Sequence, residues 1–264
     1  MTPASSRWEH IPHTLVGAVP MVVTAHLVEP IVYARDGIHL DGLLSHAAVL
    51  ELDAKTRRRM TPLSSECPPD VALPLARWRV PVRVDDEHTA RLCYERTSHA
   101  LRQGAGILWG WCASAEDAHW LLHGRAEVRK KPSFAELARY SDAPSVNVAA
   151  GAMKAYDLAL PTVQAHRVRW YALGNPDAVA HLLRTHVRAL GRKRGTGWGL
   201  VDSWEVEPRA EDWSVERWEP QSETLILMRR MPRECRFEGR QSIAAIRPPY
   251  FHASRCVPTT EPAL

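Results

Sequence analysis

The 264-residue chain lacks closely spaced cysteine pairs and long apolar runs. Its five cysteines are widely spaced and include no CxxC pair, which argues against both a disulfide framework and a zinc ribbon. Such cysteine usage is typical of a reducing, cytoplasmic compartment. No stretch approaches the ~18 uninterrupted apolar residues that a membrane span requires. The apolar run 15–23 is broken by Pro20 and is interpreted as a first strand rather than a signal segment, so no membrane partner is expected.

The motifs of several enzyme classes are also missing. The sequence contains no GxxxxGK[ST] phosphate loop and no GxSxG nucleophile turn. His119 and His123 are spaced i, i+4, but no glutamate completes an HExxH motif. A two-histidine phosphoesterase would need a second copy of the H-x-[ST] pattern that begins at His252. The sequence therefore predicts no catalytic residue, no metal site and no cofactor.

The composition fits a globular protein with a mild positive charge. Hydrophobic residues make up 45% of the chain and charged residues 24%, which is enough to bury a core. The net charge of +4 and the pI of about 8.9 restrict the partners only loosely, because many ordinary enzymes share them. The position of the charge is therefore more informative than its sum.

The first third of the chain predicts a strand, a helix and a second strand. Residues 21–28 are rich in β-branched side chains, as expected of a strand. Residues 40–50 form a helical pattern whose apolar face consists of Leu40, Leu43, Leu44 and Ala47. Four prolines in residues 61–76 predict an irregular loop, and a strand follows at 77–84.

The order strand, helix, strand returns in the second half. Residues 166–173 alternate apolar and basic side chains and are predicted to form a strand. Asn175 and Pro176 predict the N-cap and the first position of a helix that ends at Gly191. A last strand is predicted at 198–206.

Together these segments predict an α+β fold with a ferredoxin-like core. The core is expected to comprise residues 20–84 and 166–207, within a domain of residues 20–207. Residues 85–165 are interpreted as an insertion. Residues 208–264 are expected to form a C-terminal extension packed on the core.

A basic, glycine-rich loop, residues 191–199, carries the strongest chemical signal. Between Asp177 and Asp202 there is no acidic residue, and the lysines and arginines of this stretch are Arg184, Arg188, Arg192, Lys193 and Arg194. Next come Gly195 and Gly197, and glycine permits positive φ angles and lets backbone N–H groups approach an anion closely. Trp198 offers a face on which an unpaired base could stack, worth roughly 1–3 kcal/mol. The alternative is that the glycines only form a tight turn beside a solvated charge run.

In its position after a helix and before the final strand, this loop resembles the glycine-rich loop of the RAMP superfamily, the ferredoxin-like (RRM-like) RNA-binding proteins of CRISPR systems. Two further segments extend the resemblance. Residues 38–44 (IHLDGLL) and residues 247–251 (RPPYF), together with the first strand, resemble the third Csf subunit of type IV CRISPR effector complexes, the Cas-five-like member.

The resemblance implies a non-catalytic, cytoplasmic backbone subunit that caps the 5′ handle of a single-stranded CRISPR RNA. Its expected partners are this RNA, the other Csf backbone and large subunits, and indirectly the target DNA. The resemblance also implies that the insertion acts as a thumb that reaches the RNA through Arg125, Arg129, Lys130 and Lys131. The alternative for these four residues is a solvated surface, softened by Glu127 and Glu136.

Two other functions stay open at this level. A processing endoribonuclease of the same superfamily would use a histidine as general acid or base at the RNA 2′-OH. The histidines on predicted elements are His26, His39, His46, His166 and His181. A protein-interaction scaffold without RNA contact would instead use the acidic stretch 205–223 and the apolar run 225–228 to hold its partners.

Overall fold

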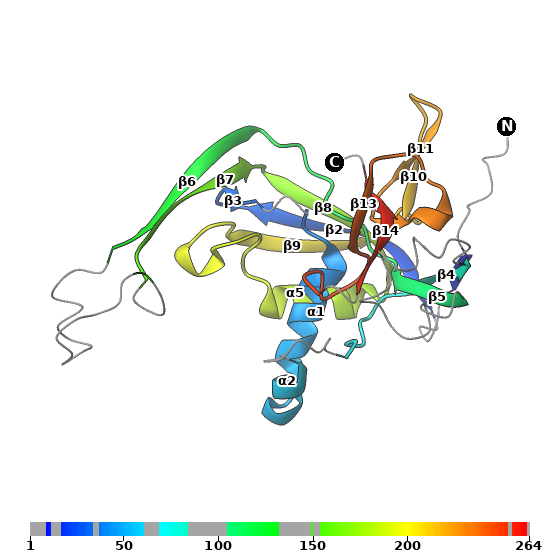
Figure 1. Ribbon diagram of the computed structural model, residues 1–264, viewed down its shortest axis with the longest axis horizontal. Coiled ribbons are helices and arrows are strands. Elements are labelled where there is room, and N and C mark those ends of the chain that lie inside the picture. Colours follow the sequence, from blue (N-terminus) through cyan, green and yellow to red (C-terminus); the bar gives the residue numbers. More distant parts are fainter. Residues whose placement is uncertain are drawn as a thin grey trace.

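The computed structural model describes residues 9–11, 17–33, 37–60, 69–83, 105–131, 149, 154–252 and 255–262. In these residues the helices are α1 (Leu40–Glu51), α2 (Ala54–Met60) and α5 (Pro176–His186). The strands are β1 (Glu9–Ile11), β2 (Val19–Leu27), β3 (Ile31–Val32), β4 (Arg77–Arg83), β5 (Ala105–Trp111), β6 (Leu122–Lys130), β7 (Tyr156–Gln164), β8 (Arg167–Gly174), β9 (Val201–Pro208), β10 (Glu216–Glu219), β11 (Thr224–Leu227), β12 (Met231–Pro232), β13 (Gln241–Ala245) and β14 (Cys256–Thr260). The α+β prediction is confirmed (Figure 1).

The central sheet has the strand order β8-β2-β9. β2 runs antiparallel to both neighbours, so β8 and β9 are parallel to each other and are joined through α5. Helices α1 and α5 pack together on one side of this sheet (Figure 1). The predicted strands at 21–28 and 166–173 and the predicted helix at 40–50 are therefore confirmed, with small shifts of their ends.

The main core lies between this sheet and the two helices. Val23 and Ala25 of β2 and Trp170 of β8 are buried there with Leu44 of α1 and Leu183 of α5. Trp170 also donates its indole N–H to the carbonyl oxygen of Ile38 at 2.7 Å, so its polar atom is satisfied inside the core. The apolar side chains Val168, Trp170 and Ala172, which alternate along β8, are thus buried in this core.

Helix α5 begins as the sequence predicts and ends earlier. The side chain of Asn175 accepts a hydrogen bond from the backbone N–H of Ala178 at 3.1 Å, and proline follows at the first helical position. The predicted end at Gly191 is wrong, because the helix stops at His186. The chain is instead drawn into pairing with the segment before β9, where Ala189 forms a bridge with Leu200.

The predicted strand at 77–84 forms as β4, but its place in a β-α-β unit of the core is wrong. β4 lies between β1 and β5 in a separate sheet. Its Trp78 and Val80 are buried in a second core together with Leu108, Met231 and Val257. Packing against the C-terminal part of the chain therefore decides where this strand lies.

The edge of β8 that faces away from β2 is covered by irregular backbone. Ser114 donates its backbone N–H to Tyr171 at 2.8 Å, and Asp117 donates to Arg169 at the same distance. Residues 112–117 thus run along β8 without forming a regular strand.

Within the predicted insertion, β6 and β7 pair over their whole length, and β7 also pairs with β3. We call β6 and β7 the arm. Figure 1 shows the arm, in green, reaching away from the central sheet. Residues 132–148, which follow the outer end of β6, lie outside the described residues.

The C-terminal part of the chain forms the β10–β11 hairpin and the sheet β12-β14-β13. A buried arginine, Arg229, connects this C-terminal part to the rest of the molecule. Its guanidinium donates to the carbonyl oxygens of Trp111, of Ala113 at 2.9 Å and of Ile246 at 2.6 Å, and it lies 3.6 Å from the carboxylate of Asp41. Within the described part of the chain, no helix is both long and apolar enough to cross a membrane.

Candidate nucleic-acid interface

The mouth of the basic loop is held in place by backbone hydrogen bonds. Leu190 donates to the carbonyl oxygen of Gly199 at 2.8 Å, which closes the loop on itself. Gly199 donates to Pro30 at 2.9 Å, and Arg192 donates to Val32 at 2.9 Å. The loop is therefore fixed against β3 and the segment that precedes it.

The four glycines of loop 191–199 form two pairs that differ in the space around them. Gly191 and Gly199 have φ angles of 75° and 70°, and a Cβ atom at either position would clash with neighbouring backbone or side-chain atoms. These two glycines are needed for the turn. Gly195 and Gly197 have nothing within 4 Å of such an atom, and Gly197 has a φ of 93°. Their backbone faces open space, where a ligand could approach it.

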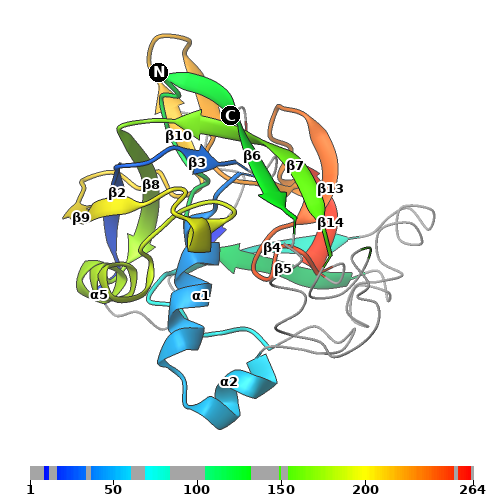
Figure 2. The same ribbon diagram turned by 90° about the vertical axis from the view of Figure 1, so that its left-hand side faces the viewer.

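The basic side chains of the loop lie between the arm and helix α1. Arg192 and Arg194 are exposed, whereas Trp198 is half-buried. The ammonium group of Lys193 lies 5.1 Å from the ring centroid of Tyr156, the first residue of β7. Figure 2 shows the loop, in yellow, between the arm and α1. The predicted loop residues thus stand next to the predicted insertion residues.

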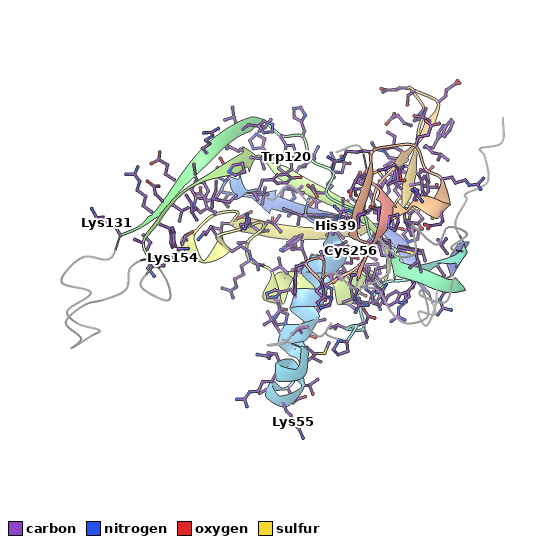
Figure 3. The ribbon with its side chains drawn as sticks, viewed as in Figure 1. His39, Lys55, Trp120, Lys131, Lys154 and Cys256 are labelled. Carbon is purple, nitrogen blue, oxygen red and sulfur yellow. The ribbon has the colours of Figure 1, made fainter. Side chains whose placement is uncertain are left out.

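Arg125, Arg129 and Lys130 of β6 and Lys131, which follows this strand, are all exposed. In the β6–β7 register Lys130 lies opposite Tyr156, the residue that Lys193 contacts, so the two predicted basic clusters meet at the outer end of the arm. Figure 3 labels Lys131 and Lys154 at this end. Arg129 forms an ion pair with Asp157 at 2.9 Å, which offsets part of its charge.

Arg184 and Arg188 stand apart from the tip of the loop. Arg184 donates through its Nε and Nη2 atoms to the carbonyl oxygen of Trp204, both at 3.2 Å, and so joins α5 to β9. Trp204 in turn donates its indole N–H to the carbonyl oxygen of Val187 at 2.8 Å. Arg188 is exposed. An RNA contact of these two arginines stays a prediction.

The histidines His46, His181 and His186 lie close to one another near the basic loop. His181 and His186 of α5 both bond through Nε2 to one carboxylate oxygen of Glu51, at 2.9 and 3.2 Å. Burial lowers the pKa of His46 on α1, and the positive charges of Arg194 and His186 lower it further. The sequence did not reveal this cluster, because Glu51 is 130 positions away from His181. Among the described residues, no group of three or more histidines, cysteines and acidic residues could hold a metal ion.

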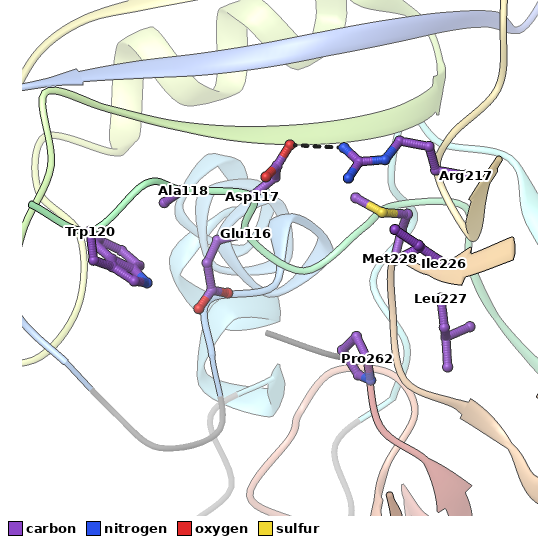
Figure 4. Close-up of a pocket in the computed structure, with 9 residues that line it drawn as sticks. All are labelled: Glu116, Asp117, Ala118, Trp120, Arg217, Ile226, Leu227, Met228 and Pro262. Carbon is purple, nitrogen blue, oxygen red and sulfur yellow. Dashed lines mark hydrogen bonds and ion pairs between the residues drawn. The ribbon is translucent and has the colours of Figure 1, made fainter. Parts of the chain in front are cut away.

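A small pocket of about 140 Å³ lies on the opposite side of β8 from β2 (Figure 4). It is lined in part by Asp117 and Arg217, which form an ion pair at 3.4 Å, and by Glu116. The Glu116 carboxylate accepts hydrogen bonds from the Tyr33 hydroxyl and the Ile38 backbone N–H, and burial raises its pKa. Glu116, Asp117 and Arg217 are thus each paired within the protein, and the residues that line the pocket include none of the basic loop.

Comparison with known protein families gives one match. The family model of the CRISPR type IV associated protein Csf3 matches residues 120–262, more than half of the chain, whereas no curated protein matches. The matched region includes the arm, β8, α5, the basic loop, β9 and nearly all of the C-terminal part. The chain therefore belongs to the Csf3 family and is a subunit of a type IV CRISPR effector complex.

Proposed function

We propose that this subunit binds the CRISPR RNA of its complex and caps the 5′ handle without cutting it. The observation that carries the proposal is the meeting of two basic clusters at one surface. Arg192, Lys193 and Arg194 of the loop lie beside the arm that carries Lys130 and Lys131.

This surface suits a phosphate backbone. Arginine binds phosphate oxygens through two parallel N–H donors, and lysine adds a compact positive charge. The open backbone at Gly195 and Gly197 leaves room for an anion to approach the main chain. Because Trp198 is half-buried, it would present only part of its ring to a base. The expected target is a single strand, because the major groove of an RNA duplex is too deep and narrow for side chains to read its base edges.

The fold supports the same proposal. In a ferredoxin-like RAMP core the first strand is flanked by the third and the fourth, which matches β8-β2-β9. The second strand of such a core would lie beside β8, where the backbone of residues 112–117 runs here. The arm would then be the thumb that reaches the RNA. Neighbouring Csf subunits would complete the complex, with target DNA contacted indirectly.

The salt dependence of RNA binding tests the proposal. For single strands, the logarithm of the affinity falls with the logarithm of the salt concentration by about 0.7 for each neutralised phosphate. The triple variant Arg192→Ala/Lys193→Ala/Arg194→Ala should therefore weaken binding of a handle RNA and flatten the slope by about 2. A control with the same charge loss is Arg233→Ala/Arg236→Ala/Arg240→Ala, at three exposed positions of the C-terminal part.

Retained affinity and an unchanged slope in the loop variant, with a normal control, would contradict RNA binding by the loop. If the chain still assembled with other Csf subunits, that result would favour a scaffold that holds its partners through protein contacts.

RNA processing is a second candidate function, because His46, His181 and His186 gather beside Arg194. Acid–base cleavage of RNA needs a histidine that can reach the 2′-OH or the leaving oxygen. The Nε2 atoms of His181 and His186 are both bonded to Glu51, which leaves His46 as the residue to test. Cleavage of unprocessed repeat RNA that is lost in His46→Ala would establish processing. Intact RNA after incubation with the wild-type chain would support a purely binding role.

A further inference from the structure

We propose that the groove between α1 and the turn 248–251 accepts a base of the bound RNA, so that this surface forms a stacking site beside the basic loop. This inference rests on the proposed RNA binding and adds a second contact to it. The groove has a volume of about 430 Å³, which lies within the range of roughly 300–1,000 Å³ for small-ligand pockets.

The walls of the groove suit a flat, partly apolar ring. Pro248, Pro249, Tyr250 and Phe251 line one side, and Trp111 and Val49 contribute elsewhere. Phe251 is 82% exposed, although a large aromatic side chain gains free energy when it is covered. Bases of any sequence can stack on such a ring, because each base has a π face. An exposed phenylalanine at the rim is therefore a suitable stacking platform.

Two polar residues of α1 also line the groove, Ser45 and His46. A hydroxyl group and an imidazole ring can form hydrogen bonds with the edge of a base. The carboxylate of Asp70 lines the groove too, but it is paired with Arg255 at 2.9 Å and with Arg247 at 3.5 Å, so its charge is offset. The groove thus combines an apolar surface with hydrogen-bonding groups and little net negative charge.

The position of His46 connects the groove to the basic loop. His46 lines the groove and also lies close enough to Arg194 that the arginine's charge lowers the pKa of the imidazole. A strand held by the loop would therefore pass near the groove. Helix α2, which contributes Met60 to the lining, adds exposed Lys55 and Arg58. Positive charge on two sides favours a nucleic-acid strand over an acidic or neutral surface as the occupant.

The test compares two probes, a short oligouridylate and an abasic oligomer of the same length. Phe251→Leu keeps an apolar side chain but removes the aromatic face, so it should weaken oligouridylate binding by roughly 5- to 150-fold and leave the abasic probe unaffected. Phe251→Tyr should restore the affinity. Trp218→Ala is the control, because Trp218 is an exposed aromatic residue, at 44%, on the separate β10–β11 hairpin.

Photo-crosslinking of thiouridine-substituted RNA locates the contact directly, and a crosslink to the peptide that contains Tyr250 and Phe251 is expected. Salt-dependent binding of both probes with no effect of Phe251→Leu and no such crosslink would overturn the stacking site while leaving the proposed function intact. Failure of the wild-type chain to bind either probe would overturn both. If Phe251→Leu impaired only assembly with other Csf subunits, the groove would be a protein-docking site instead.

Discussion

Replacing Arg229 with methionine should destabilise the protein strongly, because this arginine is fully buried and joins three parts of the chain. Methionine fills much of the same volume but cannot donate hydrogen bonds. The change removes this donor from the carbonyl oxygens of Trp111, Ala113 and Ile246, of which the Trp111 oxygen still accepts from the backbone N–H of Ala113 at 2.9 Å. Each buried acceptor left unpaired costs about 1–3 kcal/mol. For the carbonyls of Ala113 and Ile246 together, a loss of about 4 kcal/mol in the free energy of unfolding is expected, which lowers the Tm by about 8–16 °C.

The matched variant Asp41→Asn should cost less than Arg229→Met, because the guanidinium keeps its three carbonyl acceptors. Asp41 lies 3.6 Å from Arg229, which is longer than a hydrogen bond, and burial raises the pKa of its carboxyl group more than the arginine lowers it. A neutral asparagine avoids the cost of burying the charge and keeps an oxygen for the Tyr250 hydroxyl, which donates to Asp41 at 2.6 Å. The guanidinium is therefore held mainly by carbonyl groups.

The pH dependence follows from the same raised pKa. The native state takes up the Asp41 proton at higher pH than the unfolded state does, so this proton stabilises the fold fully below the ordinary pKa of 3.8. The stabilisation is lost as the pH rises through the raised native pKa. Relative to Asp41→Asn, the wild-type protein should therefore lose stability as the pH rises across this window.

Urea unfolding followed by tryptophan fluorescence measures both variants, with unchanged m values showing that the same surface is exposed on unfolding. The reasoning would be refuted if Asp41→Asn lost as much stability as Arg229→Met, because the carboxylate would then be the main partner of the guanidinium.

Three further predictions concern other parts of the chain. Gly199→Ala should lower the free energy of unfolding by more than about 1 kcal/mol, because φ is 70° there. Gly195→Ala should leave the thermal midpoint unchanged, because nothing lies within 4 Å of an added Cβ atom. Equal midpoints for the two variants would contradict the assignment of Gly199 to the turn and of Gly195 to the open part of the loop. Asn175→Ala should cost about 0.5–2 kcal/mol in urea unfolding through loss of the α5 cap, and no loss would show that the cap is dispensable. Burial raises the pKa of Cys235 to about 12, so iodoacetamide at about pH 8 should leave this thiol unmodified. Peptide mapping should show that the half-exposed Cys256 reacts more readily. Rapid alkylation of Cys235 would contradict its burial.

The elements that were predicted correctly are specified by residues that lie close together in the sequence. Asn175 and Pro176 mark the start of α5 in the sequence and form the cap in the structure. The end of α5 was misplaced because long-range backbone pairing decides it, through the bonds from Leu190 to Gly199 and from Arg192 to Val32. Local periodicity contains no information about such partners.

The sheet assignment of β4 shows the same limit. The strand itself was predictable from residues 77–84, but its partners were not. Trp78 lies in a core with Val257, which is far away in the chain, and the sequence pattern of the strand does not specify that contact. A strand with apolar residues can join any sheet whose exposed edge and core accept it.

The candidate interface was predictable only where its residues are consecutive. Arg192, Lys193 and Arg194 stand together in the sequence, so their shared field could be recognised. The meeting of Lys193 with Tyr156 depends on the fold and could not be read from spacing. The groove near Phe251 was missed for the same reason, because its walls come from α1 and from the C-terminal turn.

The two short segments that carried the family resemblance, 38–44 and 247–251, lie together in the structure. The rings of His39 and Tyr250 stack with centroids 4.5 Å apart, and the Tyr250 hydroxyl bonds to Asp41. A Cβ atom at Gly42 would lie 3.4 Å from the Tyr250 ring, so this junction also shapes the groove. Substitution of Tyr250 would therefore disturb stability and ligand binding together. Phe251 is exposed and forms no part of the buried junction, which is why its replacement separates the two effects.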